Sequence, residues 1–182
     1  DPRRAGPAAK ADLWLQVRPG TDAALALGIA AVMIERGWYD RDFVREWTNG
    51  PLLVRTDTGR FLTKVDLANG SPGRYVAWDE AAGRPTVYDP ATGRYGGEEL
   101  ALLGTFRVDT PVGEVVCRPA FDLVAEGSGR YSPARVEAIC GVPAGQVVDT
   151  ARLLWASRPV AYYAWSGVEQ HTNATQISRA IG

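Results

Sequence analysis

The sequence begins with a group of residues that could contact a nucleotide: Asp1, Pro2, Arg3 and Arg4. In α/β folds that bind dinucleotides, an acidic residue after a strand accepts hydrogen bonds from ribose hydroxyls, and arginines meet phosphate or base edges. A proline prevents the backbone from continuing as a strand ladder. A solvated turn is an equally open interpretation of these residues.

A second group with binding chemistry is the turn Gly20-Thr21-Asp22, which precedes an apolar segment with helical character. Glycine lets a ligand approach the backbone closely, and the free N–H groups at a helix start are hydrogen-bond donors. The Asp22 carboxylate could accept two hydrogen bonds from the N1–H and N2–H₂ edge of guanine, a pair that no other base offers. The alternative is simple helix capping, and both can hold if Thr21 caps and Asp22 faces outward.

The third group contains the only histidine of the chain, His171, together with Ser166, Gly167 and Gln170. These polar residues follow an apolar run and precede a helical segment, where side chains are expected to face a cleft. A lone histidine without suitably spaced cysteines does not form a zinc site. Ser166 lacks the preceding glycine of a nucleophile elbow, so a polar loop without chemistry is the alternative.

Buried strands are predicted just before the second and third groups, at 13–17 and 160–165, because both runs are short, apolar and rich in β-formers. The segment Ala23–Arg36 is apolar on nearly every face, which predicts a helix packed on several sides. Alternation of such strands and helices predicts an α/β fold: a Rossmann-like parallel sheet flanked by helices. Ligands in such folds collect where strands end and helices begin, and the three groups satisfy that rule.

The middle of the chain has a different texture, since the stretch 50–119 contains half of the 20 glycines and half of the 12 prolines. Short β-rich runs alternate there with turn signals, which predicts a hairpin-rich β insertion. Helical patterns flank it. The predicted division is therefore a first part of a cofactor-binding domain, an insertion and a second part, at 1–49, 50–118 and 119–182.

Composition excludes several classes of function. The formal net charge is −1, so there is no basic field for nucleic acid. No apolar run reaches about 18 residues, which argues against membrane insertion. Cys117 and Cys140 lack CxxC partners, which disfavours a disulfide scaffold, a zinc ribbon or an iron–sulfur site within this chain.

Several blocks, in this order, resemble the prokaryotic molybdopterin oxidoreductases of the dimethyl-sulfoxide-reductase family. They are Asp1-Pro2-Arg3-Arg4, Lys10-Ala11-Asp12, the run from Arg18 to Gly28 (RPGTDAALALG), Trp38 to Val44 (WYDRDFV), Tyr131 to Glu137 (YSPARVE), Gly141-Val142-Pro143 and Tyr163 to Thr172 (YAWSGVEQHT).

The resemblance implies that the chain is part of the central region of a catalytic subunit that binds a bis(molybdopterin guanine dinucleotide) cofactor with molybdenum or tungsten. On that model Asp1, Pro2, Arg3 and Arg4 line the guanosine end, and Gly20, Thr21 and Asp22 recognise the guanosine. Ser166, Gly167 and Gln170, with His171 in the same loop, match the pterin side.

The resemblance also carries expectations about what lies outside the chain. The family's iron–sulfur cysteines and metal-ligating residue have no counterpart here and are expected upstream of Asp1, so we expect a piece of a longer polypeptide that is inactive in isolation. The expected partner is the remainder of the same subunit, with an iron–sulfur electron-transfer subunit as a further candidate. A stand-alone nucleotide-binding module without redox activity is the alternative, and a hydrolase using His171 is disfavoured because no partner nucleophile is evident.

Overall fold

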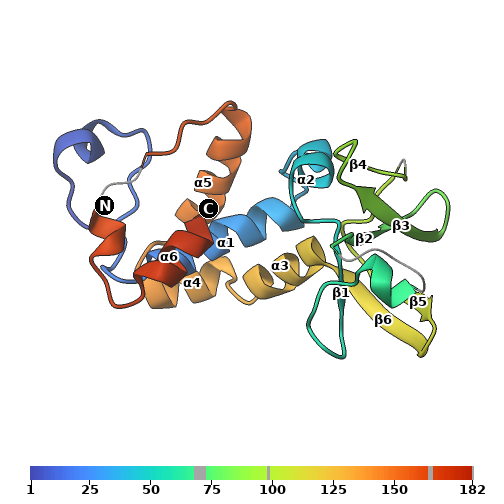
Figure 1. Cartoon of the computed structure of the whole chain (residues 1–182). Coiled ribbons are helices and arrows are strands. Elements are labelled where there is room, and N and C mark those ends of the chain that lie inside the picture. The colour runs from blue at the N-terminus through green and yellow to red at the C-terminus, as the bar shows by residue number, and fades with distance from the viewer. Residues whose placement is uncertain (68–72, 98, 164–165, 182) are drawn as a thin grey trace. The chain divides into compact units, whose positions relative to one another are not determined.

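A computed structural model describes residues 1–67, 73–97, 99–163 and 166–181 (Figure 1). The chain divides into two compact units, one made of Asp1–Tyr39 with Ala125–Gly182 and the other of Asp40–Val124. The predicted insertion, 50–118, lies inside the second unit. That 1–49 and 119–182 are two parts of one cofactor-binding domain stays a prediction.

The first unit is helical and is built around α1 (Asp22–Glu35), which packs against α4 (Pro133–Cys140), α5 (Ala144–Ala156) and α6 (Ala174–Ile181). This arrangement explains why the α1 sequence is apolar on nearly every face, as predicted. The unit also contains the single-turn helices η1 (Gly6–Lys10) and η3 (Ser166–Glu169) and the end of α3 (Ala120–Gly129). Its buried core consists of Val17, Ala24, Leu25, Val136, Cys140, Val142 and Val147.

The helices α1 and α4 approach each other closely at Gly28. A Cβ atom on Gly28 would lie only 2.3 Å from Cγ2 of Val136, so no larger residue fits without movement. Local signals set the ends of α4: the Ser132 hydroxyl accepts from the backbone of Arg135, and Gly141 closes the helix with φ +76°. Serine before a helix and glycine after it satisfy backbone groups that the helix itself leaves unpaired.

The second unit contains two small antiparallel sheets, as the hairpin-rich sequence predicts. One has the strand order β1 (Leu53–Arg55), β6 (Gly113–Pro119), β5 (Phe106–Thr110), and the other has the order β2 (Val76–Asp79), β3 (Arg84–Asp89), β4 (Arg94–Tyr95). The unit also holds α2 (Arg41–Trp47) and η2 (Lys64–Leu67). Leu53, Leu62, Val76, Val108, Val115 and Cys117 form its buried core.

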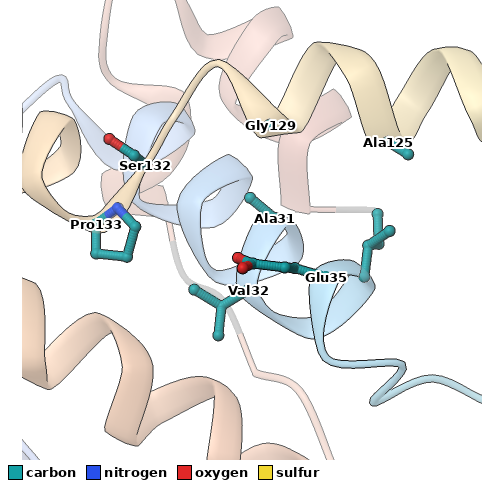
Figure 2. Close-up of a pocket in the computed structure, with 8 residues that line it drawn as sticks. Ala31, Val32, Glu35, Ala125, Gly129, Ser132 and Pro133 are labelled. Atoms are coloured by element: carbon teal, nitrogen blue, oxygen red, sulfur yellow. The ribbon is translucent and has the colours of Figure 1, made fainter.

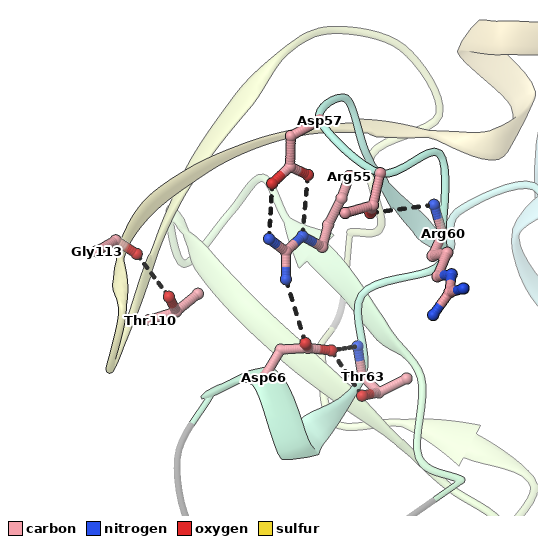
Figure 3. A network of polar contacts seen from close by, with 8 residues as sticks. Arg55, Asp57, Arg60, Thr63, Asp66, Thr110 and Gly113 are labelled. Atoms are coloured by element: carbon pink, nitrogen blue, oxygen red, sulfur yellow. Dashed lines mark hydrogen bonds and ion pairs between the residues drawn. The ribbon is translucent and has the colours of Figure 1, made fainter.

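A polar network ties β1 to η2 in this unit (Figure 3). The guanidinium group of Arg55 donates two hydrogen bonds to Asp57, at 2.7 and 3.0 Å, and one to Asp66 at 3.3 Å. Asp66 in turn accepts from the backbone and the hydroxyl of Thr63, at 2.8 and 2.7 Å. The arginine is therefore held between two carboxylates from neighbouring segments.

The predicted parallel sheet is not found in the described part of the chain. The fold is mixed α/β, but all of its described strand pairs are antiparallel. Residues 13–17 and 160–163 are not strands, and 164–165 lie outside the described residues. A strand requires a hydrogen-bonded neighbour, and neither segment pairs with another in the described chain. Val17 is instead buried in the helical core, which accounts for the apolar pattern near it.

No helix among the described ranges is both long and apolar enough to cross a bilayer.

Candidate functional site

The turn Gly20-Thr21-Asp22 forms the entry to α1. Gly20 has φ +83°, a conformation that side chains disfavour, and this lets the backbone turn sharply after Pro19. Asp22 begins the helix, and its half-exposed carboxylate forms no hydrogen bond or ion pair with another described residue. An unpartnered carboxylate beside the free N–H groups of a helix start can accept from a ligand while the helix dipole stabilises its charge.

The predicted side-chain cap by Thr21 is not formed. Thr21 occupies the N-cap position, but its hydroxyl donates to the carbonyl oxygen of Arg18 at 2.7 Å. The threonine therefore tightens the turn before the helix. The N–H groups of the first helical turn are left to other partners, because a cap would have accepted from one of them.

The end of α4 holds this turn in place. The Arg18 backbone donates to the Cys140 carbonyl and its guanidinium donates to the Ile139 carbonyl, both at 2.9 Å. The Cys140 thiol donates to the Thr21 carbonyl oxygen at 3.4 Å. Burial raises the pKa of this thiol, although its hydrogen bond to Thr21 opposes the shift, so Cys140 stays a neutral donor.

The structure brings the loop with His171 to the same turn. A Cβ atom on Gly20 would lie 3.7 Å from the His171 Nδ1 atom, an ordinary contact distance. The Asn173 side-chain amide donates to the Gly20 carbonyl oxygen at 3.1 Å, although the two residues are 153 positions apart. The second and third groups are thus neighbours in space, and their role in binding stays a prediction.

Ser166 and Gly167 lie in η3, which packs against α6, and Gln170 follows it. All three side chains or backbone positions are exposed, whereas His171 is half-buried. Exposed amide and hydroxyl groups next to a half-buried imidazole can donate to a polar ligand. Only His171 of these four directly approaches the Gly20 turn among the contacts of the described residues.

Asp1 lies against the extended segment that leads into the turn. Its backbone nitrogen donates to the Leu15 carbonyl at 3.2 Å, and its carbonyl accepts from the Trp14 indole at 2.9 Å. The Asp1 carboxylate accepts from the backbone of Arg3 at 2.9 Å. The residue therefore forms a local turn, which is the alternative that the sequence left open, and its second carboxylate oxygen stays available.

Pro2 and Arg4 contact the same segment. The Pro2 carbonyl accepts from the Gln16 side chain at 3.3 Å, and the Arg4 guanidinium lies 5.8 Å from the centre of the Trp14 ring. Asp1, Pro2, Arg3 and Arg4 are all exposed. No hydrogen bond within the described ranges joins these four residues to the Gly20 turn or to the His171 loop, so the structure unites two of the three predicted groups directly.

Metal ligation by the cysteines is disfavoured. Burial raises the pKa of the Cys117 thiol to about 11, and a metal needs a thiolate. In the described ranges no three His, Cys, Asp or Glu side chains are grouped so that they could hold a metal ion.

A cavity of about 330 Å³ lies at the opposite end of α1 (Figure 2). Small and apolar side chains from α1, from the end of α3 and from the start of α4 line it, with one carboxylate, that of Glu35. The 14 residues of α1 span about 21 Å at 1.5 Å per residue, so this cavity is remote from the Gly20 turn. No predicted site residue lines it.

The second unit has a wider cleft, of about 840 Å³, between α2 and the β3–β4 hairpin. Trp47, Tyr88 and Tyr95 contribute aromatic surface to it, and burial raises the pKa of Tyr95 to about 12. The Arg45 side chain lies in it, near the carboxylates of Glu80 and Glu99 at 3.8 and 3.5 Å. The sequence analysis indicated no binding function for these residues.

Sequence reasoning missed the two side chains that hold the turn. Asn173 lies in the polar loop and precedes a helix, so its position was a usable signal. Cys140 had no such signal, because its contact with Thr21 joins residues 119 positions apart in the chain.

Comparison with known proteins bears on what this site belongs to. The chain is 28% identical to the alpha subunit of perchlorate reductase from Dechloromonas aromatica, over 96% of this chain and 22% of that protein. It is 29% identical to the sulfite dehydrogenase protein of Allochromatium vinosum that carries the letter A, over 100% of this chain and 21% of that protein. It is 30% identical to the catalytic protein of a putative dimethyl sulfoxide reductase of Halobacterium salinarum, over 98% and 21%.

The solved structure of acetylene hydratase from Pelobacter acetylenicus has a similar fold, with a TM-score of 0.57 and 21% identity, over 99% of this chain and 15% of that one. No family model matches the chain. The chain spans about a fifth of the length of the curated relatives named above.

These relatives place the chain in the class of large oxidoreductase subunits. More narrowly, the chain is homologous to a segment of the molybdopterin catalytic subunits of the dimethyl-sulfoxide-reductase family, which confirms the resemblance found in the sequence.

Proposed function

We propose that this chain is a cofactor-binding segment of a molybdenum or tungsten oxidoreductase catalytic subunit, and that it binds the guanosine end of a molybdopterin guanine dinucleotide. The observation that carries the proposal is the unpartnered Asp22 carboxylate at the start of α1, with the His171 loop packed beside the same turn.

The donors and acceptors at this turn fit such a ligand. The Asp22 carboxylate matches the two N–H donors of a guanine edge, and a charge-assisted pair of this kind is among the stronger hydrogen-bonded contacts. The uncapped N–H groups at the start of α1 suit the anionic part of the nucleotide. Gly20, with no side chain, leaves room for the ligand to approach.

Other residues of the chain would bind the rest of the group. Ser166, Gly167 and Gln170 are exposed near the same loop and would offer polar groups to the pterin, with His171 behind them. Asp1, Pro2, Arg3 and Arg4 are exposed along the segment that enters the turn and would line the guanosine end. When bound, the metal of the cofactor supplies two-electron redox chemistry by oxygen-atom or by hydride or proton-and-electron transfer.

The whole protein would therefore be an oxidoreductase, and the isolated chain would be inactive because the metal ligand is contributed by the remainder of the same subunit. An iron–sulfur cluster is expected in that remainder. The relatives are named as lettered subunits of their enzymes, which supports association with a further subunit, and we propose an iron–sulfur electron-transfer subunit for that role.

The test is to purify the full gene product, to measure molybdenum and tungsten by elemental analysis, and to release bound nucleotide with acid. We expect one of the two metals together with a guanosine nucleotide. A purified protein that contains neither metal nor guanosine nucleotide would contradict the proposal.

A further inference from the structure

We propose that Asn173 is a positioning residue that sets the direction of the Asp22 carboxylate by holding the turn before it. This inference rests on the proposed function, because it concerns the same turn. It adds that the His171 loop and the guanosine-binding turn act as one unit, joined by a side chain that contacts no cofactor itself.

The first step is the contact between Asn173 and Gly20. The Asn173 Nδ2 atom lies 3.1 Å from the Gly20 carbonyl oxygen. A carbonyl oxygen can only accept, so the amide must present its N–H group to the turn. Asn173 directly precedes α6, which is anchored to α1 and carries the fully buried Ile177. The donor is therefore mounted on a packed helix.

The second step is that neighbouring carbonyl groups in the turn are all held from the protein side. The Gly20 carbonyl accepts from Asn173, and the Thr21 carbonyl accepts from the Cys140 thiol at 3.4 Å and from the Ala24 backbone at 3.0 Å. Each peptide unit is planar and trans, so its N–H points opposite to its carbonyl. Holding the Thr21 carbonyl inward therefore turns the Asp22 N–H outward.

The third step concerns Asp22 itself. Its carboxylate has no partner among the described residues, so no contact of its own fixes its direction. Its direction follows from the backbone of the turn, which Gly20 makes adaptable because glycine tolerates many conformations. The Asn173 hydrogen bond removes that freedom, which lowers the entropy that a ligand would otherwise have to overcome on binding.

The test must separate this role from helix capping, because asparagine before α6 could simply stabilise that helix. Aspartate caps a helix as well as asparagine does, but it has no N–H to give to Gly20. In the full gene product we compare Asn173→Asp and Asn173→Ala with the neighbouring exposed control Thr172→Ala. The measurement is guanosine nucleotide retained per protein after extended gel filtration, with the unfolding temperature alongside.

We expect both Asn173 variants to lose retained nucleotide, about 10-fold in affinity for Asn173→Asp, since the loss of one hydrogen bond changes a binding constant by roughly that factor. Thr172→Ala should retain the wild-type amount. If Asn173→Asp also retains the wild-type amount, Asn173 is a helix cap or a surface residue and the inference is wrong.

A double variant adds a readout that a general structural role would not produce. If Asn173 acts through the Gly20–Asp22 turn, then Asp22→Ala with Asn173→Ala retains as much nucleotide as Asp22→Ala alone, because coupled residues are not additive. Multiplying losses would overturn the inference. Loss on Asp22→Ala with no loss on either Asn173 variant overturns it while the proposed function stands. Absence of nucleotide from the unmodified protein overturns both.

Discussion

At the scale of single residues, Asp22 is distinguished by what it does not contact. Most charged side chains of known geometry in this chain are paired, as Arg55 is with Asp57 and Asp66. The Asp22 carboxylate is half-exposed at the start of a 14-residue helix and has no partner in the described ranges. A carboxylate is stabilised by the positive end of the helix dipole, and it remains free to accept from a ligand.

We predict that Asp22→Ala in the full gene product reduces cofactor retention. A charge-assisted bidentate pair contributes roughly 2–4 kcal/mol, so the loss should be large when guanosine nucleotide is released and quantified. Glu35→Ala, at the other end of α1, is the matched control and should leave cofactor content unchanged. Unchanged content in Asp22→Ala would show that Asp22 is only a helix-start residue.

At the scale of elements, α1 connects the site to the core. Its first residue is Asp22, and its buried residues Ala24, Leu25, Gly28 and Val32 face the other helices of the first unit. The turn is therefore as well positioned as the packing of α1 against α4, α5 and α6 allows. The close approach at Gly28 is the tightest point of that packing for which a contact distance is known.

We predict that Gly28→Ala destabilises the protein by about 1–3 kcal/mol, because a new methyl group must be forced into a packed core. Its Cβ would lie 2.3 Å from Val136 Cγ2 and 3.2 Å from the Tyr131 carbonyl oxygen. Gly127→Ala is the control, since a Cβ there meets nothing within 4 Å and alanine favours a helix. Chemical unfolding should show loss for Gly28→Ala and a small gain or no change for Gly127→Ala.

The polar network that joins β1 to η2 predicts a dependence of stability on acid pH (Figure 3). The hydrogen bond from the Thr63 hydroxyl, with those from the Thr63 backbone and Arg55, lowers the pKa of Asp66 below its ordinary value of 3.8. A carboxyl group whose pKa is lowered by folding stabilises the fold above its unfolded pKa. That stabilisation is lost as the pH falls through the folded value.

We therefore predict that Asp66→Asn is less stable than the unmodified protein at pH 7, by about 1–2 kcal/mol, because charged hydrogen bonds to Thr63 and Arg55 are lost. Its stability should also change less between pH 4 and pH 2, since one of the groups that titrate there is gone. Urea unfolding at both ends of this range measures it. Asp57→Asn should have a smaller effect, because Asp57 is 53% exposed; parallel curves for Asp66→Asn and the unmodified protein would contradict the prediction.

At the scale of the whole molecule, the chain is a two-unit segment that spans about a fifth of its relatives. Its helical unit carries all the predicted site residues, and its β-rich unit, Asp40–Val124, carries none. The described residues supply contacts for one end of a ligand and no metal-ligand cluster. On the proposed function, catalysis needs the remainder of the subunit.

We predict that the isolated 182-residue chain is folded but has no redox activity with artificial electron donors or acceptors, whereas the full gene product loaded with cofactor has it. Circular dichroism checks the fold, and dye-linked assays check activity. Turnover by the isolated chain, at a level that a metal chelator does not remove, would contradict the prediction and favour a catalytic group inside these residues.

The sequence by itself determined the features that depend on local signals. The ends of α4 at Ser132 and Gly141, the all-round apolar character of α1 and the hairpins of the second unit could be predicted because capping, periodicity and turn residues act over a few positions. The family could be recognised because its motifs follow one another in order.

Only the tertiary structure decided which distant residues meet. The contacts of Asn173 with Gly20 and of Cys140 with Thr21 join residues more than 100 positions apart, and no local pattern encodes them. The strands predicted at 13–17 and 160–165 show the same limit. An apolar β-forming run states that a segment prefers burial, but whether it becomes a strand depends on a neighbour elsewhere, and at 13–17 and 160–163 the described chain provides none.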